Sequence, residues 1–455
     1  MGCDAGIFKA YDVRGIFPEQ LDNEVAYKIG QAYVDVIKPQ GEVLVGRDVR
    51  IHSEELKNAL VQGIVDAGVD VVDVGLMSTD MLYFGTGFYP VGGGVQVTAS
   101  HNPPEWHGFK MVRAGAVPIS GDTGITEVKD WVMGTKKLLV EKKGKVRQME
   151  IWDEYCRHIL KWINVEKIKP MKVVINPNFG LAGKVFHKIV EMGKLPLQII
   201  DLNCEPDGTF PKGRPDPFVP ENRPEFLQLI KDSNADLGIT WDADADRVFF
   251  ATEEGVFAEP YYTNTVLAKN LLVKNPGAKV IYDVRYIWAL IDAIKEAGGE
   301  PVGCRVGHSF IKAMMREVDG VFGAESSGHT YYKDFWFADC GMIPPMQVLE
   351  HLSITGKKMS EMINPIAEKY PISGEINNKV TNAKEIMEQI SKVYPDAVQE
   401  RVDGLSVEYP DFRFNLRTSN TEPLLRLCLE AHDKKTMELK KVEVLDLIKK
   451  LGTSI

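Results

Sequence analysis

The sequence predicts an α/β protein in which one unit with parallel strands occurs three times and is followed by a smaller α+β unit. Short β-branched runs at 43–45, 173–175 and 280–282 are each followed by a helical stretch and by further strand-like runs. Strands that alternate with helical segments indicate βαβ units. The chain has 455 residues, too many for a single hydrophobic core. From about residue 370 the pattern changes to alternating polar and apolar residues.

The three units share their internal order. A second strand-like run follows each helical stretch, at 69–72, 197–200 and 301–304, and a third is expected at 95–97, 236–239 and 318–322. Each third run leads into the most polar loop of its unit, TASHN (98–102), DADADR (242–247) or ESSGH (325–329). Loops beyond the carboxyl ends of parallel strands line the ligand crevice of such sheets. The three units would therefore each present a different loop from an equivalent, ligand-facing position.

Domain boundaries follow from the repeat. The charged run TKKLLVEKKGKVRQ (135–148) is typical of a surface connection, and further boundaries fall near 254 and 370. We therefore expect domains at 1–150, 151–254, 255–369 and 370–455. In the last domain, 405–409 and 412–417 read as half-exposed antiparallel strands, and amphipathic helices are expected over Ala383–Val393 and Lys434–Leu451.

The composition, 44% hydrophobic and 26% charged, is that of an ordinary globular protein. A net charge of -10 argues against nucleic acid as a partner, although a small anionic ligand remains compatible if a few basic side chains converge. No run of 18 apolar residues and no apolar signal core occurs, so we expect a cytoplasmic protein without membrane association. The six scattered cysteines argue against a zinc site and a disulfide framework.

The acidic loop carries the most specific local signal. Asp242, Asp244 and Asp246 alternate just after a predicted strand, so their carboxylates can turn toward one point, which a cation makes favourable. The glycine and glutamate of an EF-hand are missing, and three carboxylates leave room for waters and a phosphate oxygen around Mg²⁺. A solvated acidic turn is the alternative, but apolar neighbours such as Trp241 and Phe249 would bury the loop.

Ser100 lies in the first of the three polar loops, on a turn beyond the predicted strand that Pro103 and Pro104 stiffen. His101 is adjacent and Lys110 follows ten residues later. The same composition occurs in ordinary turns. Beside a Mg²⁺ site, however, a serine suggests phosphoryl chemistry, which needs positioning and charge neutralisation. Acyl transfer would favour a GxSxG elbow, which TASHN is not.

Other polar clusters could supply anion and sugar contacts. The run RTSNT (417–421) offers a guanidinium, hydroxyls and an amide at a strand end, which is good phosphate-binding chemistry. Each cluster also fits a polar turn or surface loop, so residue types alone leave these roles open. The candidates are Lys9, Tyr11, Arg14, His308, Glu325, Ser327, His329, Arg417, Ser419, Asn420, Thr421 and Arg426.

Together the motifs resemble the α-D-phosphohexomutase superfamily, most closely its bacterial-type phosphomannomutase/phosphoglucomutase branch. In chain order they are AYDVRG (10–15), TASHNPP (98–104), GFK (108–110), DADADR (242–247), VGHSFIK (306–312), GAESSGH (323–329) and RTSNTEPLLR (417–426). The resemblance implies a heart-shaped molecule of four domains, three related α/β domains with mixed sheets and a smaller C-terminal α+β domain. It also implies a monomer or homodimer that binds hexose phosphates.

The activity that the resemblance implies is interconversion of hexose 1-phosphate and hexose 6-phosphate, with mannose or glucose as the sugar. The reaction would pass through a phosphoserine and a hexose 1,6-bisphosphate, with Mg²⁺ as cofactor and glucose 1,6-bisphosphate or an equivalent as activator. Left open are a phosphoglucosamine mutase, because the loop 325–329 does not settle the group at carbon 2, a Mg²⁺-dependent sugar phosphatase and a non-catalytic sugar-phosphate sensor.

The resemblance also assigns residues. The phosphorylated serine falls on Ser100, and the Mg²⁺ ligands are the phosphoserine oxygen, Asp242, Asp244 and Asp246. The implied catalytic residues are Ser100, His101, Lys110, Arg247 and His308, with Lys110 as general acid or base. The implied substrate-binding residues are Tyr11, Arg14, Arg285, Glu325, Ser327, His329, Arg417, Ser419, Asn420, Thr421 and Arg426. The sequence departs from the family at Ala243 (often glycine), His107 (usually asparagine) and Arg285 (commonly lysine), and an arginine cannot shuttle a proton.

Overall fold

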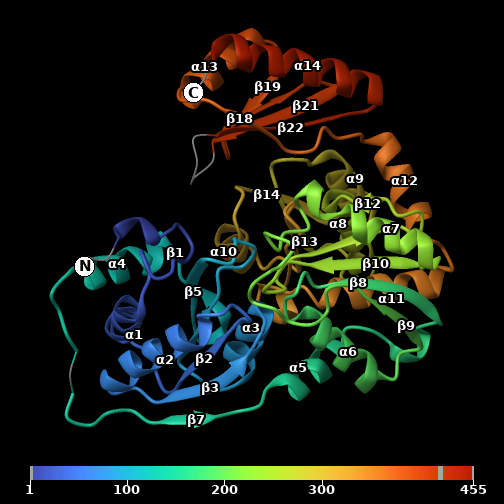
Figure 1. Cartoon of the computed structure of the whole chain (residues 1–455). Coiled ribbons are helices and arrows are strands. Elements are labelled where there is room, and N and C mark those ends of the chain that lie inside the picture. Colours follow the sequence, from blue (N-terminus) through green and yellow to red (C-terminus); the bar gives the residue numbers. More distant parts are fainter. Residues whose placement is uncertain (1–3, 139, 419–423, 453–455) are drawn as a thin grey trace. The chain divides into compact units, whose positions relative to one another are not determined.

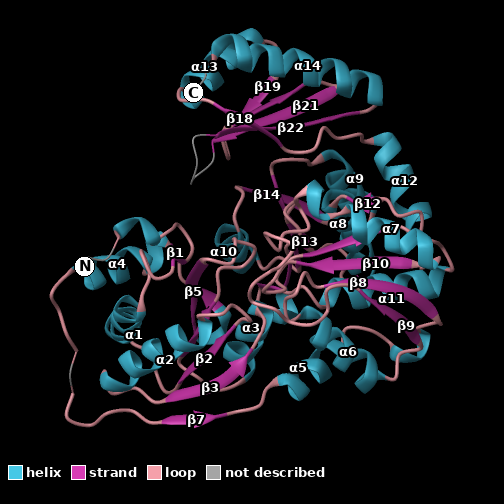
Figure 2. Cartoon of the chain, viewed as in Figure 1, coloured by secondary structure: helices cyan, strands magenta, loops and turns pink. Residues whose placement is uncertain are grey.

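The computed structural model describes residues 4–138, 140–418 and 424–452 (Figure 1). The chain divides into two compact units. The first, which we call unit 1, contains Met1–Phe257 and Ser327–Met359, and unit 2 contains Ala258–Ser326 and Ser360–Ile455. Helices and strands alternate along most of the chain, as Figure 2 shows.

The first sheet of unit 1 is mixed. Its strands run in the order β1-β5-β4-β2-β3-β7, with β6 on β5. The central strand β2 pairs in parallel with β3 and β4, whereas β5 is antiparallel to β4 and β1. Val43, Val45 and Val95 are fully buried, since β-branched residues on central strands pack into the core. The elements are β1 (Val13–Ile16), α1 (Asn23–Ile37), β2 (Val43–Arg47), α2 (Ser53–Asp66), β3 (Val71–Leu76), α3 (Thr79–Phe88), β4 (Gly93–Val97), β5 (Trp106–Arg113), β6 (Val117–Pro118), α4 (Ile125–Met133) and β7 (Val146–Gln148).

The second sheet has the same character. Strand β8 pairs in parallel with β9 and β10, and β10 forms an antiparallel hairpin with β11. The acidic loop is the turn of this hairpin, so it lies at the carboxyl end of a fully buried strand, β10. The elements are α5 (Trp152–Leu160), β8 (Met171–Asn176), α6 (Ala182–Gly193), β9 (Leu197–Asp201), α7 (Pro224–Ser233), β10 (Leu237–Trp241), β11 (Val248–Ala251) and β12 (Phe257–Ala258).

The third strand set begins in unit 2, where β13 pairs in parallel with β14 and β15. The prediction of a strand at 318–322 was wrong. Val318 is the last residue of α10, Asp319 ends the helix in the left-handed conformation, and the strand begins only at Phe322. The elements are α8 (Pro260–Lys274), β13 (Lys279–Asp283), α9 (Trp288–Glu296), β14 (Glu300–Cys304), α10 (His308–Val318) and β15 (Phe322–Ala324). In unit 1, β16 (Thr330–Tyr332) pairs antiparallel with β17 (Ala338–Asp339), and α11 (Ile343–Thr355) follows.

The C-terminal sheet is entirely antiparallel, in the order β18-β22-β21-β20-β19. Helices α13 (Ala383–Val393) and α14 (Lys434–Leu451) have the predicted bounds and lie together on one face of this sheet (Figure 1). Ile386 and Ile390 pack with Phe414 and Leu427 in the core beneath them. The expected α/β units with mixed sheets and the final α+β unit are thus confirmed. The remaining elements are α12 (Met359–Lys369), β18 (Ile376–Lys379), β19 (Val398–Glu400), β20 (Leu405–Glu408), β21 (Phe412–Thr418) and β22 (Leu424–Ala431).

Candidate active site

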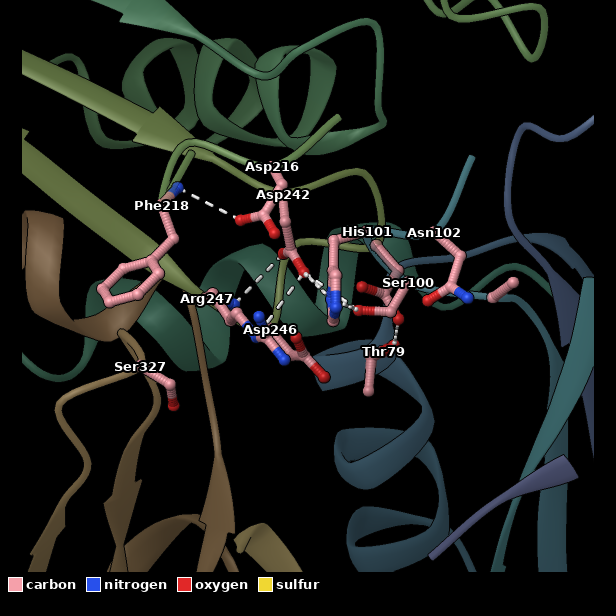
Figure 3. A network of polar contacts seen from close by, with 12 residues as sticks. Thr79, Ser100, His101, Asn102, Asp216, Phe218, Asp242, Asp246, Arg247 and Ser327 are labelled. Atoms are coloured by element: carbon pink, nitrogen blue, oxygen red, sulfur yellow. Dashed lines mark hydrogen bonds and ion pairs between the residues drawn. The ribbon is translucent and has the colours of Figure 1, made fainter. Parts of the chain in front are cut away.

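Ser100 is buried at the tip of β4 and is aimed at the acidic loop (Figure 3). Its Oγ lies 3.0 Å from Asp242 Oδ2 and 3.1 Å from His101 Nδ1. The backbone of Ser100 has a φ of +51°, in the left-handed region that a residue with a Cβ rarely adopts. The surrounding residues must therefore hold this conformation.

Arginine side chains bind most of the main-chain carbonyls of the serine loop, which we define as residues 99–106. Arg14 Nη1 lies 3.4 Å from Ala99 O and 2.6 Å from Asn102 Oδ1. Arg214 Nε lies 3.1 Å from His101 O, and the guanidinium of Arg50 binds four further carbonyls. Sequence reasoning found Arg14 but missed the other two, because a side chain that binds backbone carbonyls leaves no motif.

The acidic loop brings its three aspartates together as predicted. Asp242, Asp244 and Asp246 are buried, and one carboxylate oxygen of each lies within 4.8 Å of the others. The start of α3 supports the loop: the Thr79 N–H donates to Asp244 O (2.8 Å), and its hydroxyl donates to Asp244 Oδ2 (2.6 Å). Gly341 allows the turn to pack closely, since a Cβ there would lie 2.1 Å from Ala245 O.

Charge in the loop is unevenly compensated. Burial and the neighbouring carboxylates of Asp244 and Asp246 raise the pKa of Asp242 well above its usual value. Burial also disfavours a charged Asp246, but the Lys110 ammonium and His329 outweigh it and hold the pKa of Asp246 well below its usual value. Lys110 Nζ lies 2.8 Å from Asp244 Oδ2 and also donates to Asp246.

Two candidate proton-transfer groups next to these carboxylates, Lys110 and His101, differ in protonation state. Burial disfavours the Lys110 ammonium, but Asp244 and Asp246 raise its pKa above the ordinary value, so it carries its proton at neutral pH. Burial and then the guanidiniums of Arg247 and Arg14 hold the pKa of His101 well below its ordinary value, so its imidazole is neutral. Titratable groups whose environments push their pKa values apart are suited to acid and base roles.

The acidic loop fits a hard divalent cation. Its donors are carboxylate oxygens, the ligands that Mg²⁺ prefers. Among the described residues no hydrogen-bond donor reaches Asp244 Oδ1, although the atom is buried. An adjoining group, Asp246, His329 and Asp339, also meets the spacing for a metal, but it includes a ring nitrogen and shares Asp246. The coarser expectation of a buried acidic metal site is therefore supported at the predicted residues.

Part of the predicted sugar loop lies beside the acidic loop in unit 1. His329 Nδ1 and Ser327 Oγ are 2.9 Å apart, and His329 Nε2 lies 3.5 Å from Asp246 Oδ1. Arg247 Nε lies 3.4 Å from His329 Nε2 and 3.9 Å from Asp242 Oδ2. The half-buried Tyr11 precedes β1, the strand that carries Arg14. Lys9, also in unit 1, donates from Nζ to Gly6 O (2.5 Å).

The other predicted residues that the structure describes belong to unit 2. Arg285 makes two bonds to Asp283, of 2.9 and 3.0 Å, and lies 3.3 Å from Glu325 Oε1. Glu375, which sequence reasoning missed, lies 2.8 Å from Arg417, 3.4 Å from Arg426 and 3.6 Å from Arg285. His308 is the first residue of α10. The predictions for Ser419, Asn420 and Thr421 lie outside the described residues.

Comparison with known proteins identifies the family. Four successive models match the chain: the phosphoglucomutase/phosphomannomutase α/β/α domains I (residues 5–135), II (153–255) and III (259–370), and the C-terminal domain (375–447). The chain is a member of the phosphoglucomutase/phosphomannomutase family. The family resemblance and the fold class inferred from the sequence are thereby confirmed.

Relatives of this phosphoglucomutase/phosphomannomutase family member match it over nearly their whole length. A phosphomannomutase from Vibrio cholerae is 44% identical over 98% of this chain and 98% of its own. Xanthomonas campestris proteins described as phosphohexose mutases are 40% identical over 97% of this chain and 99% of theirs. The structure of a phosphoglucomutase/phosphomannomutase family protein from Burkholderia thailandensis superposes with a TM-score of 0.90 at 31% identity, covering 99% of this chain and 98% of its own.

None of the helices that the structure describes has both the length and the apolar character needed to cross a bilayer. The five described cysteines all carry free thiols.

Proposed function

We propose that this chain interconverts hexose 1-phosphates and hexose 6-phosphates of mannose, glucose or both through a phosphorylated Ser100. Its family and full-length relatives make it a phosphohexose mutase. The observation that carries the serine mechanism is the 3.0 Å contact between Ser100 Oγ and Asp242 within a buried carboxylate cluster. A nucleophilic oxygen beside a cation site is the arrangement that phosphoryl transfer needs.

Mg²⁺ bound by Asp242, Asp244 and Asp246 would neutralise charge on the transferring phosphoryl group. When Ser100 is reloaded, its Oγ bonds to phosphorus and gives its proton to the neutral His101. The phosphorus–oxygen bond to the sugar breaks, and Lys110 protonates the departing oxygen. Discharge of the phosphoserine to a sugar hydroxyl reverses these transfers, so that protons balance over one turnover.

The substrate has to be bound at both ends, because the bisphosphate intermediate presents each phosphate to Ser100 in turn. Arg417 and Arg426, with the run 419–421, suit the phosphate that is not reacting, since guanidiniums bind phosphate oxygens in pairs. Glu325 and Ser327 suit the sugar hydroxyls. Glucose 1,6-bisphosphate or an equivalent would load Ser100 initially, and we place the reaction in the cytoplasm.

The test is the intact mass of the protein before and after incubation with glucose 1,6-bisphosphate. We expect Ser100 to gain one phosphoryl group and mannose 1-phosphate to remove it. Ser100→Ala should gain none and lose mutase turnover, whereas Ser391→Ala, a control on α13, should behave like the unaltered chain. A protein that holds no transferable phosphate in any form would rule the mechanism out.

Comparing substrates separates the related activities. Glucosamine 6-phosphate, mannose 1-phosphate and glucose 1-phosphate would be assayed in parallel, because the loop 325–329 does not fix the group at carbon 2. Release of inorganic phosphate at the rate of isomerisation would instead identify a sugar phosphatase.

A further inference from the structure

Arg50 makes more hydrogen bonds to the serine loop than Arg14 or Arg214 does. It lies just beyond β2 and is only 1% exposed. Its Nη1 lies 2.7 Å from Pro103 O and 2.9 Å from Trp106 O. Its Nη2 lies 2.7 Å from Ser100 O and 2.6 Å from Asn102 O. One guanidinium therefore joins four carbonyls of the loop that carries the reactive serine.

The charge of Arg50 is matched by Asp48 through an ion pair, although the geometry between Nε and Asp48 Oδ2 is not that of a hydrogen bond. Nε lies 3.2 Å from Asp48 Oδ2, and Asp48 Oδ1 accepts from Ser53 Oγ (2.6 Å) and from the Arg50 N–H (3.0 Å). The ring of Phe210 covers the guanidinium at 4.9 Å. A buried guanidinium needs such a counter-charge, and its five donors form a rigid fork that an ammonium cannot reproduce.

The backbone of the serine loop supports itself only in part. The Asn102 N–H donates to Ala99 O (3.0 Å) and the Trp106 N–H donates to Pro103 O (3.1 Å), so the remaining carbonyls need donors from outside the loop. Pro103 and Pro104 have no N–H to donate, and Ser100 is held in the left-handed region. The bond from Arg50 to the carbonyl of Ser100 fixes that residue directly. The same bond turns the carbonyl oxygen of Ser100 toward the positively charged guanidinium. This contact would lessen the repulsion between that oxygen and a phosphoryl group on Ser100 Oγ.

We propose that Arg50, oriented by Asp48, is a positioning residue for phosphoryl transfer at Ser100. This inference rests on the proposed role of Ser100. Arg50 holds the serine loop in the conformation that aims Oγ at the carboxylate cluster. A displacement of about 1 Å in a reacting group can cost a hundredfold in rate. The role therefore predicts a loss in the transfer step, with the hexose phosphate still bound.

The first test uses Arg50→Lys, which keeps the charge but reaches fewer carbonyls. We expect single-turnover loading of Ser100 from glucose 1,6-bisphosphate to slow about a hundredfold. The dissociation constant for glucose 1,6-bisphosphate should change little. The thermal unfolding midpoint should fall, because buried carbonyls lose a donor, but the variant should remain folded at the assay temperature. The control is Arg47→Lys, three residues earlier at the end of β2, where the guanidinium pairs with the surface residue Glu54. The control should load like the unaltered chain.

The second test is chemical rescue. Arg50→Ala leaves a space shaped for a guanidinium, so guanidinium chloride below its denaturing concentration should restore part of the loading rate. Arg47→Ala should show no such gain. If neither Arg50 variant folds, Asp48→Asn takes their place, because it frees the guanidinium without removing it. Its loading should be slower, with affinity retained.

The outcomes separate the two proposals. If the unaltered chain accepts no phosphoryl group, the proposed function fails and this inference fails with it. If the unaltered chain is loaded and Arg50→Lys, or Asp48→Asn in its place, is loaded as fast, only the inference is overturned. A loading defect that matches the loss of affinity or of folded protein would likewise overturn it, since that pattern indicates a purely structural residue.

Discussion

Replacing Asp80 by asparagine should change how the stability of the protein depends on pH. Asp80 lies in the first turn of α3, next to the Thr79 that supports the acidic loop, and it is fully buried. Its carboxylate accepts from Tyr155 Oη (2.5 Å), from Cys340 Sγ (3.4 Å) and from the Ser78 hydroxyl. Burial outweighs these bonds and raises the pKa of Asp80 from 3.8 to about 6.

The linkage between proton binding and folding gives the direction and size of the effect of Asp80 on stability. The folded state holds the Asp80 proton more tightly than the unfolded state, so this stabilising term is complete below the unfolded pKa. It is lost as the pH rises through about 6. The difference between 3.8 and about 6 corresponds to about 3 kcal/mol. Asp80→Asn removes the ionisation, and its amide fits because hydroxyls and a thiol can accept as well as donate.

Calorimetric unfolding of the full chain at a series of pH values measures the effect, with separate domain transitions resolved where they occur. Relative to the unaltered protein, Asp80→Asn should gain stability as the pH rises through about 6, up to about 3 kcal/mol. Tyr155→Phe should have the opposite effect, because it removes a donor to the charged carboxylate. A stability difference between Asp80→Asn and the unaltered chain that is constant with pH would refute the reasoning.

Three further predictions concern other ion-paired side chains. Lys110→Met removes the ammonium that competes for Asp244, so Mg²⁺ should bind more tightly in titration calorimetry while turnover falls; an unchanged affinity would contradict this. Glu375→Gln should tighten the binding of inorganic phosphate by freeing Arg417 from its carboxylate, and weaker binding would show that the carboxylate instead preorganises the arginines. Glu430→Ala should cost about 3–5 kcal/mol in denaturant unfolding because this carboxylate is wholly buried and ion-paired; a loss below about 1 kcal/mol would contradict this.

Much of the fold was predictable because its strands are marked by β-branched runs and its C-terminal helices by a regular apolar face. The helices at Ala383–Val393 and Lys434–Leu451 have the expected bounds. The strand expected from Val318 failed because a β-branched residue also ends an amphipathic helix. Residues 319–321, which begin with the left-handed Asp319, separate this helix from the strand. Whether Asp319 adopts that conformation is a backbone property that composition does not reveal.

The candidate site was predictable where function depends on side-chain chemistry within a short segment. Ser100 and the aspartates of the acidic loop were found because strand tips concentrate unusual polar residues. Arg50 and Glu375 were not, since each acts through contacts with distant segments. Arg50 binds a carbonyl 50 positions away, and every residue provides a carbonyl, so no pattern in the sequence marks the partner.

The support of the serine loop by distant arginines also sets an order of events during synthesis. Ser100 leaves the ribosome 142 positions ahead of Asp242, and Arg214 is likewise made long after the loop that it binds. A nascent chain that ends within the first domain therefore carries the serine without its carboxylate neighbours. The contact between Ser100 and Asp242 arises only when the second domain folds against the first. A chain that ends within the first domain would therefore lack the carboxylates that the proposed transfer requires.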